Sequence, residues 1–275
     1  MRLTWEELGW ERVAARVGRR RLPDWDCTVG LVVGEGAALM IDAGSSLAEG
    51  GWLRAEAERL LGPERRVTHL ALTHPHFDHV FGAAAFTDVE VFGAVGLDAV
   101  FAYEREELCA DAVRNGLDPD AAAEAADLLV APRHSVSGEW TLDLGGGLQV
   151  LLANVGPGHT GHDLAVLIPG APGAPPSAEP PGSPASPARP APRASLPSRA
   201  SLASPEIVFC GDLVEESGEP QAGPDAVPSH WPAALDRLVD LGGEDAVYVP
   251  GHGAAVDAAF VRAQREELAT RFGVS

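Results

Sequence analysis

The chain has 275 residues, with 20 basic and 40 acidic side chains, and its formal net charge is −20. Every basic side chain is an arginine. This charge argues against nucleic acid or an anionic membrane as a partner, because both attract cationic surfaces. No apolar run approaches the ~20 residues that a membrane-spanning helix needs. Hydrophobic residues make up 45% of the chain, which is enough for a substantial buried core.

The cysteines are few and scattered. Cys27, Cys109 and Cys210 are odd in number and show no CxxC spacing. A disulfide framework or a thiolate zinc finger is therefore not expected, and the pattern favours the reducing cytoplasm.

Strands and helices alternate along the chain in the predicted secondary structure. Short apolar runs predict strands at 29–33, 38–41, 67–72, 89–92, 148–152, 164–168, 207–210 and 247–249. Helical spacing predicts helices at 52–61, 233–241 and 258–272, with two or three more in 97–130, broken near Gly116 and Pro119. Residues 10–20 fit either a strand or a helix. This order predicts an α/β protein in which helices cover two sheets.

Two segments are predicted to be insertions in a single domain that spans residues 1–275. Residues 171–205 are rich in Pro, Ala and Ser and nearly lack large apolar side chains, so we predict a disordered insertion in a loop. A domain boundary at this place is the alternative. The helical stretch at about 97–130 is either a lid over a site or an ordinary packed layer.

A histidine-rich motif follows the predicted strand at 67–72. In the sequence Thr-His-Pro-His-Phe-Asp-His at 73–79, the alternate residues His74 and His76 can point toward one position. Asp78 and His79 begin the next element and can face a second position. Imidazole and carboxylate ligands suit Zn²⁺, and also Fe or Mn. The alternative is a solvated turn, which this density of ligand-type residues disfavours.

Three further ligand-type residues stand in tight turns at the ends of predicted strands. They are His159 in Gly-Pro-Gly-His-Thr, Asp212 in Phe-Cys-Gly-Asp, and His252 in Val-Pro-Gly-His-Gly. Each signal is weak alone, and together they strengthen the prediction of a metal site.

With these residues, the chain resembles the metallo-β-lactamase superfamily, and its ligand set resembles the glyoxalase II-like branch. The resemblance implies an αββα sandwich of two mixed sheets with a metal site at one edge. It implies a first metal on His74, His76 and His159, a second on Asp78, His79 and His252, and Asp212 as the bridge between them. Asp42 matches an early motif whose acid orients a metal-bound histidine; a simple turn residue is the alternative.

The chemistry implied is hydrolysis. Two zinc ions would share a bridging hydroxide, which exists near neutral pH because the metals lower the pKa of water to roughly 7. Asp78 would bind the second metal and relay a proton. No GxSxG motif is present, so no side-chain nucleophile is indicated. An ester, thioester or lactone in a small molecule is the expected substrate.

Two other functions stay open at this point. A mononuclear iron enzyme resembling persulfide dioxygenases would use only the first group of ligands, and a non-catalytic metal-binding protein could share the fold. Among other residues, we expect Glu215 and Glu216 to be solvated, and Trp231 and Tyr248 to belong to the core.

Overall fold

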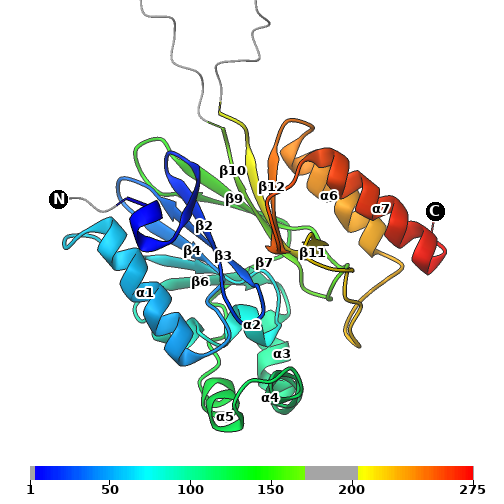
Figure 1. The fold of residues 1–275 in the computed structure, drawn as a ribbon, viewed down its shortest axis with the longest axis horizontal. Helices are drawn as coiled ribbons and strands as arrows, with labels where there is room; N and C mark the ends of the chain where they lie inside the picture. Colours follow the sequence, from blue (N-terminus) through cyan, green and yellow to red (C-terminus); the bar gives the residue numbers. More distant parts are fainter. Residues whose placement is uncertain (1–3, 171–203, 275) are drawn as a thin grey trace, which may run out of the picture.

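The structure is a computed structural model that describes residues 4–170 and 204–274 (Figure 1). Of the predicted insertion at 171–205, all but the last two residues lie outside the described residues.

A seven-stranded mixed sheet forms from the first half of the chain, in the order β1-β2-β3-β4-β5-β6-β7. The first four strands pair antiparallel, and β4 to β7 pair parallel. The bounds are β1 Glu11–Ala14, β2 Val17–Arg21, β3 Thr28–Val33, β4 Ala38–Ile41, β5 His69–Ala71, β6 Glu90–Ala94 and β7 His134–Val136.

A second mixed sheet has five strands in the order β12-β11-β10-β9-β8. Only β11 and β12 pair parallel within it. The bounds are β8 Glu139–Asp143, β9 Gln149–Asn154, β10 Leu164–Ile168, β11 Ile207–Glu215 and β12 Val247–His252.

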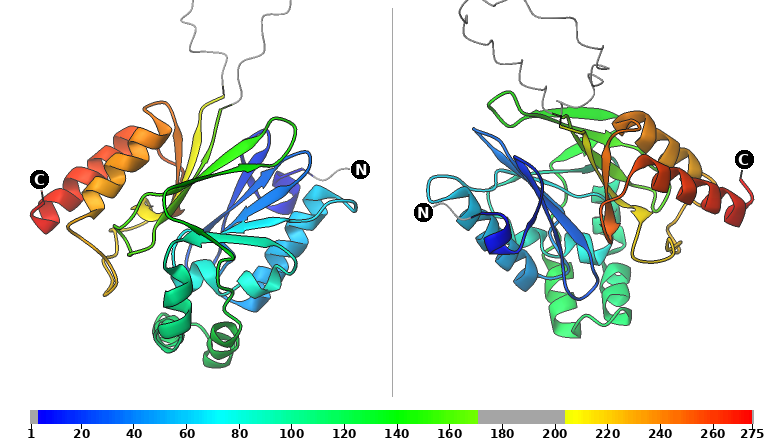
Figure 2. Two further views of the ribbon diagram at one scale, coloured as in Figure 1. Left: turned by 180° about the vertical axis from the view of Figure 1, so that it is seen from behind. Right: turned by 45° about the horizontal axis from the view of Figure 1, so that its top comes forward.

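Helices cover the outer face of each sheet, so the described residues form four layers (Figures 1 and 2). The first sheet carries α1 to α5, and the second carries α6 and α7. The bounds are α1 Leu47–Leu61, α2 Phe77–Val80, α3 Leu97–Tyr103, α4 Arg105–Arg114, α5 Pro119–Asp127, α6 Trp231–Gly242 and α7 Ala258–Phe272. The predicted α/β sandwich of two mixed sheets flanked by helices is confirmed.

The core alternates along the strands, because successive side chains of a strand point to opposite faces. In β10, Leu164 and Val166 pack between the two sheets, whereas Ala165 and Leu167 pack against α6 and α7. Burial on both faces produces the nearly continuous apolar runs from which these strands were predicted.

The helices at 97–130 are packed rather than peripheral. Leu108 and Ala112 of α4 and Ala125 of α5 are buried in the core on the outer face of the first sheet. The chain breaks at Gly116 and at Pro119, as predicted. These contacts are those of a packed layer, and a lid over the site stays a prediction.

Some elements differ from the sequence prediction. Residues 10–20 form the hairpin of β1 and β2. The strands β7 and β8 were not predicted, because both lie at sheet edges and only one of the five side chains of β8 is buried. The prediction that a strand ends at Asp212 was wrong. β11 continues to Glu215 through a register shift at Gly211, whose φ of +53° suits glycine. No helix in the described part of the chain is both long and apolar enough to cross a membrane.

Candidate metal centre

All seven predicted metal ligands meet at one edge of the sandwich. Two lie in the turn after β5 and two in the short helix α2, which starts at Phe77. The other three come from the loop between β9 and β10, from β11, and from the last residue of β12. Segments at one edge of both sheets thus bring together His74, His76, Asp78, His79, His159, Asp212 and His252.

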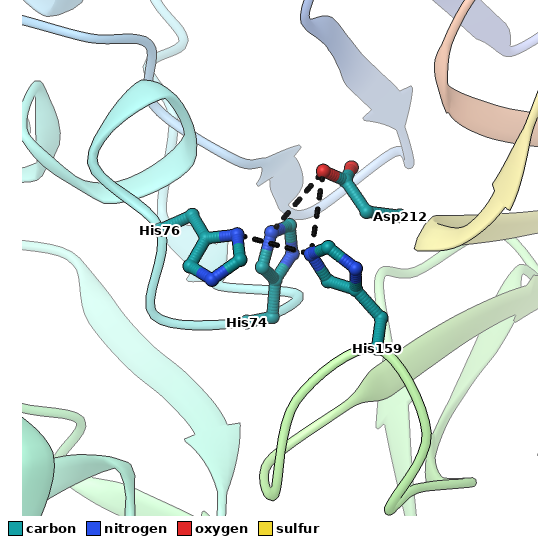
Figure 3. A group of neighbouring side chains, drawn as sticks. All are labelled: His74, His76, His159 and Asp212. Atoms are coloured by element: carbon teal, nitrogen blue, oxygen red, sulfur yellow. Dashed lines mark hydrogen bonds and ion pairs between the residues drawn. The ribbon is translucent and has the colours of Figure 1, made fainter. Parts of the chain in front are cut away.

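The first group joins three histidines and one carboxylate (Figure 3). His159 Nε2 lies 3.0 Å from His76 Nδ1. Asp212 Oδ2 lies 3.5 Å from His74 Nε2 and 3.6 Å from His159 Nε2. The four ligand atoms therefore surround one small volume.

The second group uses the same aspartate. His79 Nε2 lies 3.1 Å from Asp212 Oδ1, and His252 Nε2 lies 3.2 Å from Asp212 Oδ2. Asp78 Oδ2 is 3.6 Å from His79 Nε2 and 3.4 Å from His252 Nε2. Asp212 consequently stands between two sets of ligand atoms.

These groups fit divalent cations. Four ligands at ~2.05 Å in a tetrahedron lie about 3.3 Å from one another, and the seven distances above run from 3.0 to 3.6 Å. In addition, His74 Nε2, His79 Nε2 and Asp212 Oδ1 are buried and form no hydrogen bond within residues 4–170 and 204–274. Buried polar atoms normally have a partner, so these three atoms fit the ligands of a cation.

Asp42 fixes the orientation of His79. Its carboxylate accepts hydrogen bonds from Thr73 N, from Thr73 Oγ1 and from His79 Nδ1, each at 2.8 Å. Asp42 follows β4 with φ +60°, a conformation that aspartate tolerates better than most residues. The hydrogen bond leaves the His79 Nε2 lone pair free to face the second group. The proposed orienting role of Asp42 therefore agrees with its geometry, and it is a turn residue as well.

The four other ligand histidines also use their second ring nitrogen. His74 Nδ1 lies 2.9 Å from Thr73 Oγ1. His76 Nε2 lies 3.1 Å from Oδ2 of Asp225, a residue that was not predicted from the sequence. His159 Nδ1 donates to the carbonyl of Gln221 at 3.1 Å. His252 Nδ1 donates to the carbonyl of Trp25 at 2.7 Å. Such partners hold a histidine in one tautomer and one orientation, as metal ligands require.

The electrostatics divide the histidines by their surroundings. Burial, with His79 nearby, lowers the pKa of His74 to about 3, so its ring is neutral and its lone pair is available. Burial opposes charge on His252 as well, but Asp212 outweighs it and raises the pKa of His252 to about 10. In return, His252 and His79 overcome burial and hold the pKa of Asp212 well below its usual range. The carboxylates of the second group thus attract positive charge strongly.

Two neighbours of the second group were not predicted. Glu215, expected to be solvated, is only 8% exposed, and its Oε1 lies 3.9 Å from His252 Nε2. Burial and the nearby Asp212 raise the pKa of Glu215 to about 8. Cys27 Sγ lies 3.6 Å from His79 Nδ1, although the sequence places no cysteine near a histidine motif. Both come close through tertiary contacts that no local motif encodes.

Burial and contacts describe three other residues near the ligand groups or in the core. Trp231 and Tyr248 are fully buried, as expected for core residues, and Trp231 packs edge-on against His159 with 5.3 Å between ring centroids. His162 bonds to the Val95 carbonyl at 2.9 Å and is not among the ligand groups. The cluster is open to solvent where His76 is 23% and Asp225 37% exposed.

The sequence and the fold were compared with those of known proteins, and the sequence matches one family. The sequence profile described as the metallo-beta-lactamase superfamily matches residues 22–173, more than half of the chain. No curated protein matches the sequence. The metallo-beta-lactamase FIM-1 from Pseudomonas aeruginosa, solved in its mono-zinc form, is 16% identical with a TM-score of 0.60, over 97% of this chain and 96% of that one. A metallo-beta-lactamase from Hirschia baltica is 14% identical with a TM-score of 0.58, over 94% and 96%. At these identities the likeness establishes the fold and not the substrate.

Proposed function

We propose that this chain, which belongs to the metallo-beta-lactamase superfamily, is a hydrolase that holds two divalent cations and cleaves an ester, thioester or lactone bond in a small molecule. The observation that carries this proposal is the position of Asp212 between the two groups. Its Oδ2 lies within 3.6 Å of His74 and His159 in the first group and 3.2 Å from His252 in the second, and its Oδ1 lies 3.1 Å from His79.

Each ligand group has a distinct composition. His74, His76 and His159 would hold the first cation, and Asp78, His79 and His252 the second, with Asp212 shared. Neutral imidazoles and carboxylates without a thiolate suit zinc, with iron or manganese as alternatives. When bound, a pair of such ions lowers the pKa of a water between them and polarises the bond to be cleaved.

The chain's own residues complete the chemistry. Asp78 faces the second position with Oδ2, and its carboxylate is the group best placed to relay a proton to the leaving group. Asp42, Asp225 and the carbonyls of Gln221 and Trp25 keep the histidine lone pairs aimed inward. The solvent-exposed side at His76 and Asp225 gives the substrate its approach.

Two finer assignments belong to the same proposal. The complete ligand set supports the glyoxalase II-like branch rather than an iron enzyme that uses the first group alone. Cys27, Cys109 and Cys210 are free thiols, which suits the reducing cytoplasm.

The test pairs Asp212→Ala with Asp240→Ala, an exposed aspartate of α6 that serves as the control. Hydrolysis of a panel of esters, thioesters and lactones should fall about 100-fold or more in Asp212→Ala and stay unchanged in Asp240→Ala. Metal content measured on the same samples should fall below two per chain only in Asp212→Ala. Unchanged turnover in Asp212→Ala would refute the bridging role. One iron per chain with oxygen uptake would favour the oxygenase instead.

A further inference from the structure

Glu215 lies beside the second ligand group without belonging to the predicted set. It ends β11 and pairs in register with His252, which ends the parallel strand β12. Its side chain is 8% exposed, and its Oε1 is 3.9 Å from His252 Nε2, the atom that also faces Asp78 and Asp212.

Hydrogen bonds fix the backbone of Glu215, whereas its carboxylate accepts none from the described residues. Glu215 N donates to Gln264 Oε1 at 3.0 Å, and Gln264 Nε2 donates to the carbonyl of Leu213 at 2.8 Å. Gln264 is itself buried in α7. Within 4.0 Å, the only basic group that the described residues offer to the Glu215 carboxylate is His252. Burying a carboxylate with so little compensation is costly, so the position calls for a cation.

Three carboxylates therefore surround the second position. Asp78, Asp212 and Glu215 all lie within 4.0 Å of His252 Nε2, and no arginine among the described residues lies that close to any of them. An independent observation points to a ligand at the same place, because His79 Nε2 and Asp212 Oδ1 are buried there and form no hydrogen bond with any part of the chain that the structure describes. A divalent cation at this position would offset the negative charge and bind the unpartnered atoms.

The spacing distinguishes this position from a tetrahedral one. The 3.9 Å between Glu215 Oε1 and His252 Nε2 exceeds the edge of about 3.3 Å in a tetrahedral zinc site. In an octahedral shell with ligands at about 2.1 Å, ligand atoms lie about 3.0 Å apart when adjacent and about 4.2 Å apart when opposite. The observed 3.9 Å is nearest to the separation of opposite ligands, which a tetrahedral shell lacks, so Glu215 fits a shell of more than four ligands.

We propose that Glu215 is a further ligand of the second cation position and makes it an oxygen-rich site of more than four ligands that accepts Mn²⁺ or Fe²⁺. The proposal rests on the proposed function for the presence of a cation there. The first position, with three histidines and one carboxylate, keeps the preference for zinc, whereas carboxylate-rich sites suit harder cations. The two positions should then differ in metal preference, although they share Asp212.

A manganese titration of the full-length protein tests this assignment. Metal-free protein receives one equivalent of Zn²⁺ to fill the histidine-rich position and is then titrated with Mn²⁺, with free Mn²⁺ read by electron paramagnetic resonance. The wild type should bind one Mn²⁺, and Glu215→Gln should bind it at least tenfold more weakly. Glu219→Gln removes the same charge from an exposed side chain that pairs with Arg271 on the surface, and it should stay within twofold of the wild type.

A second variant separates ligation from charge. Glu215→Asp keeps the charge but withdraws the oxygens by one methylene, so a ligand predicts weaker Mn²⁺ binding in this variant too. Full Mn²⁺ affinity in Glu215→Gln, or in Glu215→Asp alone, would overturn the assignment while leaving the two-metal hydrolase intact. Retention of the first zinc equivalent in each variant verifies folding. A wild type that binds no metal would instead refute the proposed function and this inference with it.

Discussion

Replacing Asp42 by asparagine should weaken the second metal position while leaving the fold intact. The Asp42 carboxylate is buried and accepts hydrogen bonds from Thr73 N, Thr73 Oγ1 and His79 Nδ1. In Asp42→Asn, Oδ1 still accepts from Thr73 N, but an amide N–H₂ replaces the oxygen that faces His79. His79 Nδ1 must then present a lone pair, which moves the ring proton to Nε2, the nitrogen that faces the metal position.

The size of the effect follows from the role of such partners. Loss of a hydrogen-bond partner behind a metal-bound histidine typically costs 10- to 100-fold in metal affinity, or about 1.4 to 2.7 kcal/mol. Asparagine is chosen because alanine would orphan three buried donors, at about 1–3 kcal/mol each, and would confuse unfolding with metal loss. Asparagine also tolerates the positive φ of this residue.

Asp88→Asn is the matched control, since Asp88 has φ +58° against +60° for Asp42 and is exposed. Zinc affinities of both positions would be measured by competition with a chromophoric chelator, and unfolding of the metal-free proteins by urea. We expect the dissociation constant of the more weakly bound zinc to rise 10- to 100-fold in Asp42→Asn and to stay unchanged in Asp88→Asn. The free energy of unfolding of each variant should lie within about 2 kcal/mol of the wild type. Unchanged zinc binding in Asp42→Asn would refute the tautomer argument.

Three further predictions concern the first metal position, the buried Asp163 and the segment between β10 and β11. Asp225→Asn keeps an acceptor for His76 but removes its charge, so zinc affinity of the first position should fall about tenfold in chelator competition; equal affinity would contradict this. Burial raises the pKa of Asp163 to about 7, so its contribution to stability is complete below pH ~4 and is lost as pH rises through 7. The free energy of unfolding of the metal-free wild type, measured with urea, should therefore fall by up to roughly 4 kcal/mol between pH 4 and 8. Asp163→Asn should not show this fall, and an equal dependence on pH in the two proteins would contradict the prediction. Deleting residues 172–204 should leave the metal content unchanged and the melting temperature within a few degrees, because β10 and β11 pair antiparallel through Ile168 and Ile207. A loss of metal, or of ten degrees or more, would show that the segment is structural.

The sequence was informative where the determinant is local. Strands such as β3 and β10 are buried on both faces, so each is visible as an apolar run. The motif at 73–79 places ligands within one turn, and its spacing alone indicates two positions. The edge strand β8 escaped prediction because its exposed side chains leave no apolar pattern.

The parts that the sequence did not reveal depend on tertiary contacts. Asp225 meets His76 across 149 positions of the chain, and no residue near either one signals the pairing. Glu215 was expected in solvent because an acid pair after a turn usually is solvated. It is buried because β11 shifts register at Gly211 and runs on beside β12. Gly211 permits this shift, but one glycine in an apolar run does not by itself indicate where a strand continues.

The most direct test of the account is the metal content of the protein, purified without added metal and measured by elemental mass spectrometry. Two divalent cations per chain, with at most one per chain in Asp212→Ala, are the result that the shared carboxylate predicts. A single cation in both proteins, or no stoichiometric metal in the wild type, would contradict the two-metal centre.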